Sequence, residues 1–403
     1  MEKQVIRTAL IEKIKAFREK KLIKVITGVR RSGKSVLLRQ FIDCLKQDDV
    51  RENQIVYISF EELENEYLKD YKVLHEHIKE RLNPNGWTYI FLDEIQEVDE
   101  FQKTINSLLT KDKIDIYVTG SNSKLLSSEL ATLLTGRCIP IHVLPLSFKE
   151  CASIHSNNLN PEKIFNKYMK QGGFPQTLEL STQKDVYDYL DSVYSTIIRK
   201  DILTREKSVD IGVLESITKF LAHNIGSLVS STNIANALTS NKRKTSYNTV
   251  EKYIGLLKDC YIIYEVGRYD IKGKEYLKQN AKYYVVDTGL RNMLLANKET
   301  DLGHLLENIV YFELLRREYK VSIGQYGTKE IDFVATKDKK TEYYQVCASV
   351  TDKDTLAREL EPLNNIKDHY PKYLITLDEY TAGNVYNGIQ VINAIDFLLA
   401  RFM

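Results

Sequence analysis

The stretch GVRRSGKS, residues Gly28 to Ser35, decides the fold of this chain. It has two glycines separated by four residues and followed by a lysine and a hydroxyl residue, which is the pattern of a phosphate-binding loop. The glycines let the backbone wrap around a phosphate, the loop amides point inward, and the next helix begins there with the positive end of its dipole. The pattern predicts a nucleoside-triphosphate site with ATP and Mg²⁺ as cofactors. The residues expected to hold the nucleotide are Gly28, Val29, Arg30, Arg31, Ser32, Gly33, Lys34, Ser35 and Val36.

The residues on either side of the loop support this interpretation. Leu22 to Thr27 is a short apolar run typical of a strand, and Val36 to Leu45 repeats its apolar residues at helical spacing. The order strand, loop, helix favours a nucleotide site over a glycine-rich turn without a ligand. We expect Lys34 to bridge the β- and γ-phosphates and Ser35 to hold Mg²⁺.

A second element, Thr88 to Glu94 (TYIFLDE), runs from apolar residues into two carboxylates. An apolar run suits a strand buried on both faces of a parallel sheet, and its carboxyl end is where such sheets bind ligands. We expect Asp93 to orient Mg²⁺ and Glu94 to polarise the attacking water. An acidic turn after a core strand is the alternative, which the upstream loop makes less favourable.

A third strand, Ile114 to Thr119, ends in polar residues that could sense the γ-phosphate. Thr119, Ser121 and Asn122 all qualify, and we assign Asn122 to the catalytic group, with a plain polar turn as the alternative. Another predicted strand, Ile55 to Phe60, lies between the loop and Asp93 in the sequence. This spacing favours the AAA+ and RecA-like class of P-loop ATPases.

The chain resembles the prokaryotic AAA+-type ATPases that join an N-terminal P-loop domain to a C-terminal conserved domain of uncharacterised function. The resemblance rests on GVRRSGKS, FLDEIQ, the stretch Val118 to Arg137, PLSFKE and GGFP, and it covers nearly the whole chain. It implies that Arg137 is an arginine finger that acts on the nucleotide of a neighbouring subunit, and hence a homo-oligomer. The alternative for Arg137 is a solvated charge after Gly136.

Composition excludes several classes of protein. The 57 basic and 55 acidic residues give a net charge of +2, so any contact with DNA must be local. The five cysteines show no metal-ligand spacing, which argues for a reducing, cytoplasmic compartment. No apolar run approaches the length of a membrane span, so we expect no membrane association.

The predicted fold class is α/β, with a P-loop parallel sheet, a helical lid, a winged helix-turn-helix and an α/β domain like a restriction endonuclease. The expected boundaries are 1–145, 146–205, 206–290 and 291–403. In the winged helix, short polar and basic groups around the third helix suit DNA phosphates and base edges, although winged helices also serve in dimerisation. The candidate contacts are Lys242, Arg243, Lys244, Asn248 and Lys252.

The last predicted domain departs from an active nuclease. Glu307 and Asp332 match the acidic positions of the resembled fold, but the strand that should carry glutamate-x-lysine reads Gln345-Val346-Cys347. Glutamine is a weaker metal ligand, and cysteine does not replace the lysine charge. We therefore expect no cleavage.

Taken together, these features predict an ATP hydrolase whose cycle between ATP and ADP drives a conformational change coupled to double-stranded DNA. Two alternatives stay open: a nucleotide-dependent protein-interaction switch, and a DNA nuclease with an unconventional metal site.

Overall fold

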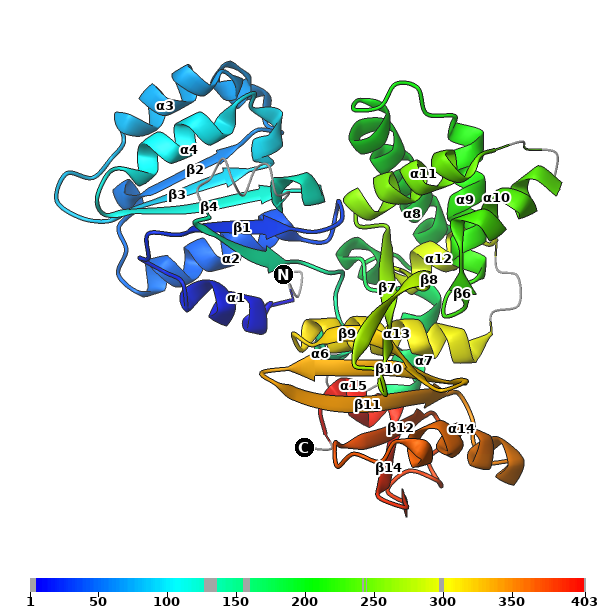
Figure 1. Ribbon diagram of the computed structural model, residues 1–403. Helices are drawn as coiled ribbons and strands as arrows, with labels where there is room; N and C mark the ends of the chain where they lie inside the picture. Colours follow the sequence, from blue (N-terminus) through cyan, green and yellow to red (C-terminus); the bar gives the residue numbers. More distant parts are fainter. Residues whose placement is uncertain are drawn as a thin grey trace. The chain divides into compact units, whose positions relative to one another are not determined.

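The computed structural model describes residues 5–126, 136–154, 160–240, 243, 245–296 and 301–401. The chain divides into two compact units (Figure 1). Unit 1 comprises residues 1–145 with Asp259–Tyr261, and unit 2 comprises residues 146–258 and 262–403. Among the described residues, no helix is both long and apolar enough to cross a membrane.

Unit 1 is a parallel sheet between two layers of helices. Its strands lie in the order β2-β3-β4-β1-β5, which is typical of P-loop NTPases and confirms the predicted fold class for this part. Helices α1 and α2 cover one face and α3 and α4 the other (Figure 1). The elements are α1 (Thr8–Lys15), β1 (Ile23–Thr27), α2 (Lys34–Gln47), β2 (Ile55–Ser59), α3 (Tyr71–Lys79), β3 (Thr88–Asp93), α4 (Phe101–Leu109), β4 (Ile114–Gly120) and β5 (Cys138–His142).

Successive side chains of the buried strands point to opposite faces of the sheet, which gives unit 1 a hydrophobic core on each face. Val25 on β1 packs with α3 and α4, whereas its neighbour Ile26 packs with α1 and α2. All residues of β1, β3 and β4 are buried, as the apolar runs in the sequence predict. The strand order inserts β4 between β3 and β1, so the polar residues after β4 lie between Asp93 and the phosphate-binding loop.

Unit 2 is built around a mixed sheet in the order β13-β14-β12-β11-β10-β9-β7-β8-β6. Its helices are α6 (Phe148–Ile154), α7 (Pro161–Gln171), α8 (Gln183–Thr196), a π-helix (Ile197–Leu203), α9 (Ile211–His223), α10 (Ser231–Ser240), α11 (Tyr247–Asp259), α12 (Thr288–Leu294), α13 (Leu302–Arg316), α14 (Lys353–Asn365) and α15 (Ala394–Leu399). Its strands are β6 (Leu228–Val229), β7 (Ile263–Asp270), β8 (Glu275–Val285), β9 (Lys320–Tyr326), β10 (Lys329–Lys337), β11 (Lys340–Cys347), β12 (Lys372–Thr376), β13 (Val385–Tyr386) and β14 (Ile389–Asn393).

The sheet of unit 2 crosses the predicted boundary at residue 290. Strand β7 pairs antiparallel with β8 and parallel with β9, through Arg268 opposite Ile323 and Asp270 opposite Gln325. Helices α9 to α11 and the β7–β8 hairpin lie in the segment predicted to be a winged helix, but this hairpin forms one sheet with the strands of the predicted nuclease-like segment. These two segments are therefore parts of a single structure.

Helix α13 is the central helix of unit 2. Every residue from Leu305 to Leu314 is buried, so this helix has no solvent face over these turns. Asn308 in α13 donates to the carbonyl oxygen of Val285 and accepts from its N–H, both at 3.0 Å, which holds the helix against β8. The helix carries Glu307 into the interior.

The GGFP sequence, Gly172 to Pro175, forms a sharp turn after α7. Gly172 has a φ of 75°, and a Cβ there would lie 2.0 Å from Asp287 Oδ1. The N–H of Gly173 donates to Asp287 Oδ2 at 2.6 Å. Only glycine leaves room here for the side chain of Asp287. The hydrogen bond from Gly173 to Asp287 joins the turn after α7 to the start of α12.

Candidate nucleotide site

The phosphate-binding loop joins β1 to α2 at the carboxyl edge of the sheet in unit 1. Gly28 lies against β5, where a Cβ would be 2.1 Å from the carbonyl oxygen of Val143, so no larger residue fits there. Gly33 has a φ of 96° and is the N-cap of α2. The helix therefore begins at Lys34, and its first-turn amides and dipole point toward the loop, as an anion site requires.

The loop residues differ in burial. Val29 is fully buried, Ser32 is buried, and Ser35 and Val36 are half-buried in the first turn of α2. Arg30 is 8% exposed and its Nη1 lies 3.1 Å from Glu61 Oε1, which follows β2. Arg31 is exposed.

Lys34 is the cation at the centre of the loop. Its Nζ donates to the carbonyl oxygens of Gly28 at 3.1 Å and Val29 at 3.2 Å. The same atom lies 3.6 Å from Glu94 Oε1, and both side chains are less than a tenth exposed. Lys34 thus lies between the loop and the carboxylate that the sequence assigns to water activation.

The carboxylates at the end of β3 are held by the neighbouring strands. Thr119 on β4 donates its hydroxyl to Asp93 Oδ1 and accepts from the N–H of Glu94 at 2.8 Å. Tyr57 on β2 donates to Asp93 Oδ2 at 3.1 Å. Burial and the adjacent Asp93 raise the pKa of Tyr57 to about 12, so its hydroxyl stays a donor.

Glu94 is ionised in this environment. Burial opposes its charge, but Lys34, a hydrogen bond from Gln96 and the charge of Arg30 outweigh that effect and lower the pKa of Glu94. Gln96 Nε2 donates to Glu94 Oε2, a contact that the sequence analysis missed. Only the proximity of Gln96 to Glu94 in the sequence could have suggested it.

Thr119 is the sensor candidate that contacts both carboxylate residues. It is fully buried between Asp93 and Glu94. Asn122, which the sequence analysis assigned to the catalytic group, is 1% exposed, and its carbonyl oxygen accepts from Leu125. Ser123 donates to Asp259 at 2.8 Å. Thr119 thus holds the acidic pair directly, through both of its hydrogen bonds.

Arg137 does not join the site of its own chain. Its carbonyl oxygen accepts from the N–H of Ile23 at 2.8 Å, at the beginning of β1, whereas the loop follows the end of that strand. Five strand residues span about 16 Å, which exceeds the length of an arginine side chain. The side chain is exposed at the amino edge of the sheet, so a role as an arginine finger requires a neighbouring chain.

Two further groups near the loop were not predicted. The guanidinium of Arg7, 5% exposed, donates to the carbonyl oxygens of Leu144 at 3.1 and 3.2 Å and of Ser32 at 3.4 Å, which braces the loop from outside. His142 lies opposite Thr27 in the register of β5 and β1. Burial, with the charge of Lys34, lowers the pKa of His142 to about 4, so its imidazole is neutral near pH 7.

The residues present fit a nucleotide-bound Mg²⁺. The hydroxyl of Ser35 and the carboxylate of Asp93 are hard oxygen ligands, and Mg²⁺ is usually held by one or two such groups together with phosphates and water. In the described part of the chain, no group of three or more His, Cys, Asp or Glu side chains is arranged to hold a metal ion. A site completed by phosphate oxygens is consistent with this finding.

The predicted DNA contacts in unit 2 are partly engaged within the unit. Lys252 lies 2.9 Å from Glu206, whose pKa is lowered to about 2 by hydrogen bonds from Ser208 and Lys252. Arg243 donates to the carbonyl oxygen of Gly212 and to Ser216 Oγ. Asn248 is exposed at the start of α11. The other two candidates, Lys242 and Lys244, lie outside the described residues.

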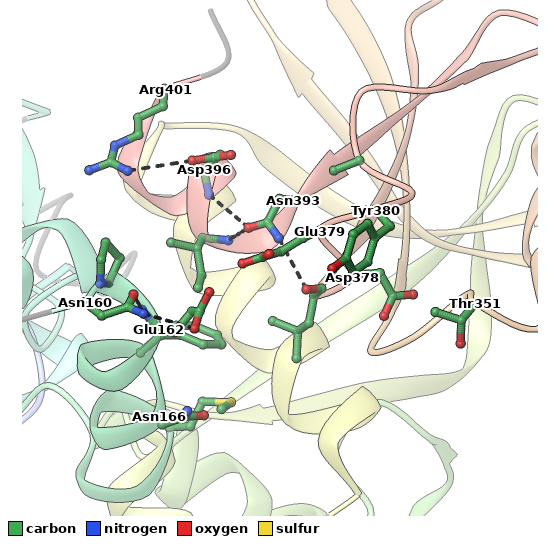
Figure 2. A pocket seen from close by; sticks show the side chains of 16 residues that line it. Asn160, Glu162, Asn166, Thr351, Asp378, Glu379, Tyr380, Asn393, Asp396 and Arg401 are labelled. Carbon is green, nitrogen blue, oxygen red and sulfur yellow. Dashed lines mark hydrogen bonds and ion pairs between the residues drawn. The ribbon is translucent and has the colours of Figure 1, made fainter.

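A cavity of about 680 Å³ in unit 2 is separate from all of these residues (Figure 2). It lies between α7 and the segment around α15, and four of its lining side chains are carboxylates. Asn393 caps α15 by accepting from Ile395 and Asp396, and Arg401 lies 3.9 Å from Asp396. Local structure thus accounts for several of its polar groups. The charged lining residues are Glu162, Asp378, Glu379, Asp396 and Arg401.

Comparisons with known proteins agree with the fold of unit 1. Residues 20–152 match the family described as AAA domain, and residues 162–301 match a domain of unknown function (DUF8612). The second match covers the predicted lid and winged-helix segments, not the nuclease-like segment to which the resemblance assigned the uncharacterised domain. A Walker-type ATPase of Pyrococcus abyssi has a similar structure, with a TM-score of 0.51 and 15% identity over 73% of this chain and 96% of that one. At this identity the likeness shows the fold alone.

Two relatives extend over most of the chain. An uncharacterized protein of Haemophilus influenzae is 40% identical over 399 residues, which is 98% of each chain. An uncharacterized protein of Methanocaldococcus jannaschii is 32% identical over 341 residues, 81% of this chain and 74% of that one. The chain therefore belongs to the same family as these two proteins, and its N-terminal part is an AAA domain.

Proposed function

We propose that the protein binds ATP with Mg²⁺ at the loop Gly28–Ser35 and hydrolyses it. One observation supports this most strongly: Lys34, Asp93, Glu94 and Thr119 meet at the carboxyl edge of the sheet, from two neighbouring strands and one helix. This is the arrangement that in-line attack of water on a terminal phosphate needs.

Each side chain has a role that follows from its contacts. When the nucleotide binds, Lys34 donates to phosphate oxygens instead of to the loop carbonyls. These phosphate oxygens lie where the loop amides converge. Glu94, ionised at neutral pH, accepts a proton from the attacking water. Thr119 keeps Asp93 and the backbone of Glu94 in fixed positions. Mg²⁺, held by Ser35 and Asp93, would offset the negative charge of the phosphates.

The test uses two substitutions and a matched control. Lys34→Ala is expected to abolish ATP binding, while Glu94→Gln is expected to bind ATP and hydrolyse it at least about 100-fold more slowly. Lys46→Ala changes an exposed lysine on the same helix that pairs with Glu52, so its turnover should equal that of the wild type. Fluorescent-nucleotide binding and phosphate release measure both steps, and normal turnover in Lys34→Ala or Glu94→Gln contradicts the assignment.

The structure gives less support to DNA as the partner of the cycle than the sequence does. Nη1 of Arg243 and Nζ of Lys252 already have partners within unit 2, so phosphate contacts of these two side chains would compete with those bonds. We therefore propose a nucleotide-dependent interaction switch, with double-stranded DNA as the alternative. ATPase turnover measured with and without DNA at two salt concentrations separates the two, because phosphate contacts make stimulation by DNA fall steeply with salt. Salt-sensitive stimulation by DNA contradicts the protein-partner proposal.

A further inference from the structure

A buried lysine lies at the centre of the nuclease-like acidic residues in unit 2. Lys282 on β8 has its Nζ 2.9 Å from Glu307 Oε1 on α13, 2.8 Å from Glu330 Oε1 and 3.4 Å from Asp332 Oδ1, both on β10. Its side chain is only 3% exposed. An ammonium has three N–H donors, and three carboxylate oxygens surround this one.

The remaining oxygens of the two buried carboxylates face protein groups. Tyr284 also donates to Glu307 Oε1, at 2.6 Å. Glu307 Oε2 faces the backbone of Gly226, where a Cβ would lie 2.5 Å away. Asp332 Oδ2 accepts from the N–H of Val346 at 2.9 Å. Each carboxylate thus has hydrogen-bond donors or backbone on both sides.

The contacts of Lys282 have the lengths of ammonium–carboxylate hydrogen bonds. Carboxylate oxygens lie about 2.0–2.6 Å from a bound Mg²⁺ or Ca²⁺ and about 2.7–2.9 Å from an ammonium nitrogen. Two of the three contacts of Lys282 fall in the second range.

The charges of this centre are consistent with a lysine that stays protonated. Burial disfavours the charged lysine, but Glu307, Asp332 and Glu330 outweigh it and raise the pKa of Lys282. Three carboxylates around one ammonium leave an excess of negative charge. Burial, with Asp332 nearby, raises the pKa of Glu307 to about 7, so this group takes up a proton near neutral pH.

We propose that the ammonium of Lys282 is the resident cation of this centre, in the place where a nuclease would bind a divalent metal ion. The strand with Gln345-Val346-Cys347 lacks the lysine of an active nuclease. Lys282, on a strand earlier in the chain, brings a lysine to this centre, and its ammonium takes the position of the metal ion. It ties β8, α13 and β10 together, and this part of the chain does not cleave DNA. The proposal does not depend on ATP hydrolysis in unit 1.

Manganese binding tests the proposal, because unbound Mn²⁺ gives a strong electron paramagnetic resonance signal that binding removes. The full-length protein without nucleotide is titrated with Mn²⁺. Wild type and Glu330→Gln are expected to bind the same amount, since no divalent ion uses the centre. Lys282→Met keeps an unbranched side chain as far as Cε and removes the ammonium group. It is expected to bind about one additional Mn²⁺ per chain, which Lys282→Met/Asp332→Asn loses.

Three results would overturn the proposal. One is Mn²⁺ binding by the wild type that is reduced in Glu330→Gln or in Asp332→Asn. This comparison does not depend on whether Lys282→Met folds. The side chain of Glu330 is 38% exposed, so the protein should tolerate its exchange. Another is a Lys282→Met protein with a wild-type circular dichroism spectrum and no additional Mn²⁺. Nicking of supercoiled plasmid by the wild type, abolished in Asp332→Asn, would contradict the proposed lack of cleavage.

Discussion

Replacing Thr119 by valine probes the link between the β4 strand and the acidic pair. Valine has nearly the same shape as threonine, so the change leaves no cavity in this fully buried position. It removes the hydrogen bond to Asp93 Oδ1 and leaves the N–H of Glu94 without its acceptor. The expected effects are a loss of both stability and turnover.

The magnitude follows from the two contacts. A hydrogen bond to a charged group contributes about 1.5–3 kcal/mol and one to a neutral group about 1 kcal/mol, so the free energy of unfolding should fall by about 2–4 kcal/mol. If about 2 kcal/mol of this is also lost from the transition state, because Asp93 and Glu94 are misplaced, turnover falls about 30-fold.

The assay compares Thr119→Val with Thr119→Ser, which keeps the hydroxyl. Phosphate release gives turnover, a fluorescent nucleotide gives ATP affinity, and urea unfolding gives stability. ATP affinity should change little in both variants, because Lys34 and the loop are intact. The reasoning is refuted if Thr119→Val turns over ATP like the wild type, or if Thr119→Ser is as slow as Thr119→Val.

Four further predictions follow from the contacts described above. Gln96→Ala removes a hydrogen bond that lowers the pKa of Glu94, so the acidic limb of the pH–rate profile should move to higher pH, and an unchanged limb contradicts the role of Gln96. Arg7→Met removes the hydrogen bonds to the carbonyl oxygens of Ser32 in the loop and of Leu144 after β5, and should weaken ATP binding by about three- to tenfold in a fluorescence titration; an equal affinity shows that the brace is dispensable. Arg137→Ala should lower turnover only at protein concentrations at which sedimentation detects self-association, and a loss in the monomer argues against action on a neighbour. The folded-state pKa of Glu307 is raised to about 7, so its stabilising contribution is complete below its ordinary pKa of about 4.3 and is lost as pH rises through 7. The free energy of unfolding of Glu307→Gln, measured in urea, should therefore rise relative to that of the wild type between about pH 5 and pH 8, and a constant difference is evidence against the shift.

The elements around the phosphate-binding loop could be predicted from the sequence almost to the residue. The apolar run Leu22 to Thr27 corresponds to β1, and the helix predicted from Val36 is α2, which begins at Lys34. This works because each loop residue has its own requirement for backbone conformation or charge. The local sequence also places the two carboxylates, because Asp93 is the last residue of a fully buried strand and Glu94 follows it.

The parts that could not be predicted depend on contacts between distant segments. Thr119 and Asn122 are equivalent polar residues in the sequence, and only the pairing of β3 with β4 brings Thr119 to Asp93. The place of Arg137 at the amino edge depends on β5 lying beside β1. Lys282 belongs to no motif, and its three carboxylate partners lie between 25 and 50 residues further along the chain.

The pairing of β7 with β9 also limits how this protein can be shortened or rearranged. A chain ending near residue 290 would leave the backbone of β7 without its neighbour at Arg268 to Asp270. Exposed strand edges of this kind pair with other molecules, so such a fragment would tend to aggregate. We therefore do not expect the C-terminal hundred or so residues to be exchanged as an independent module. Insertions in unit 2 should be better tolerated in loops outside the sheet.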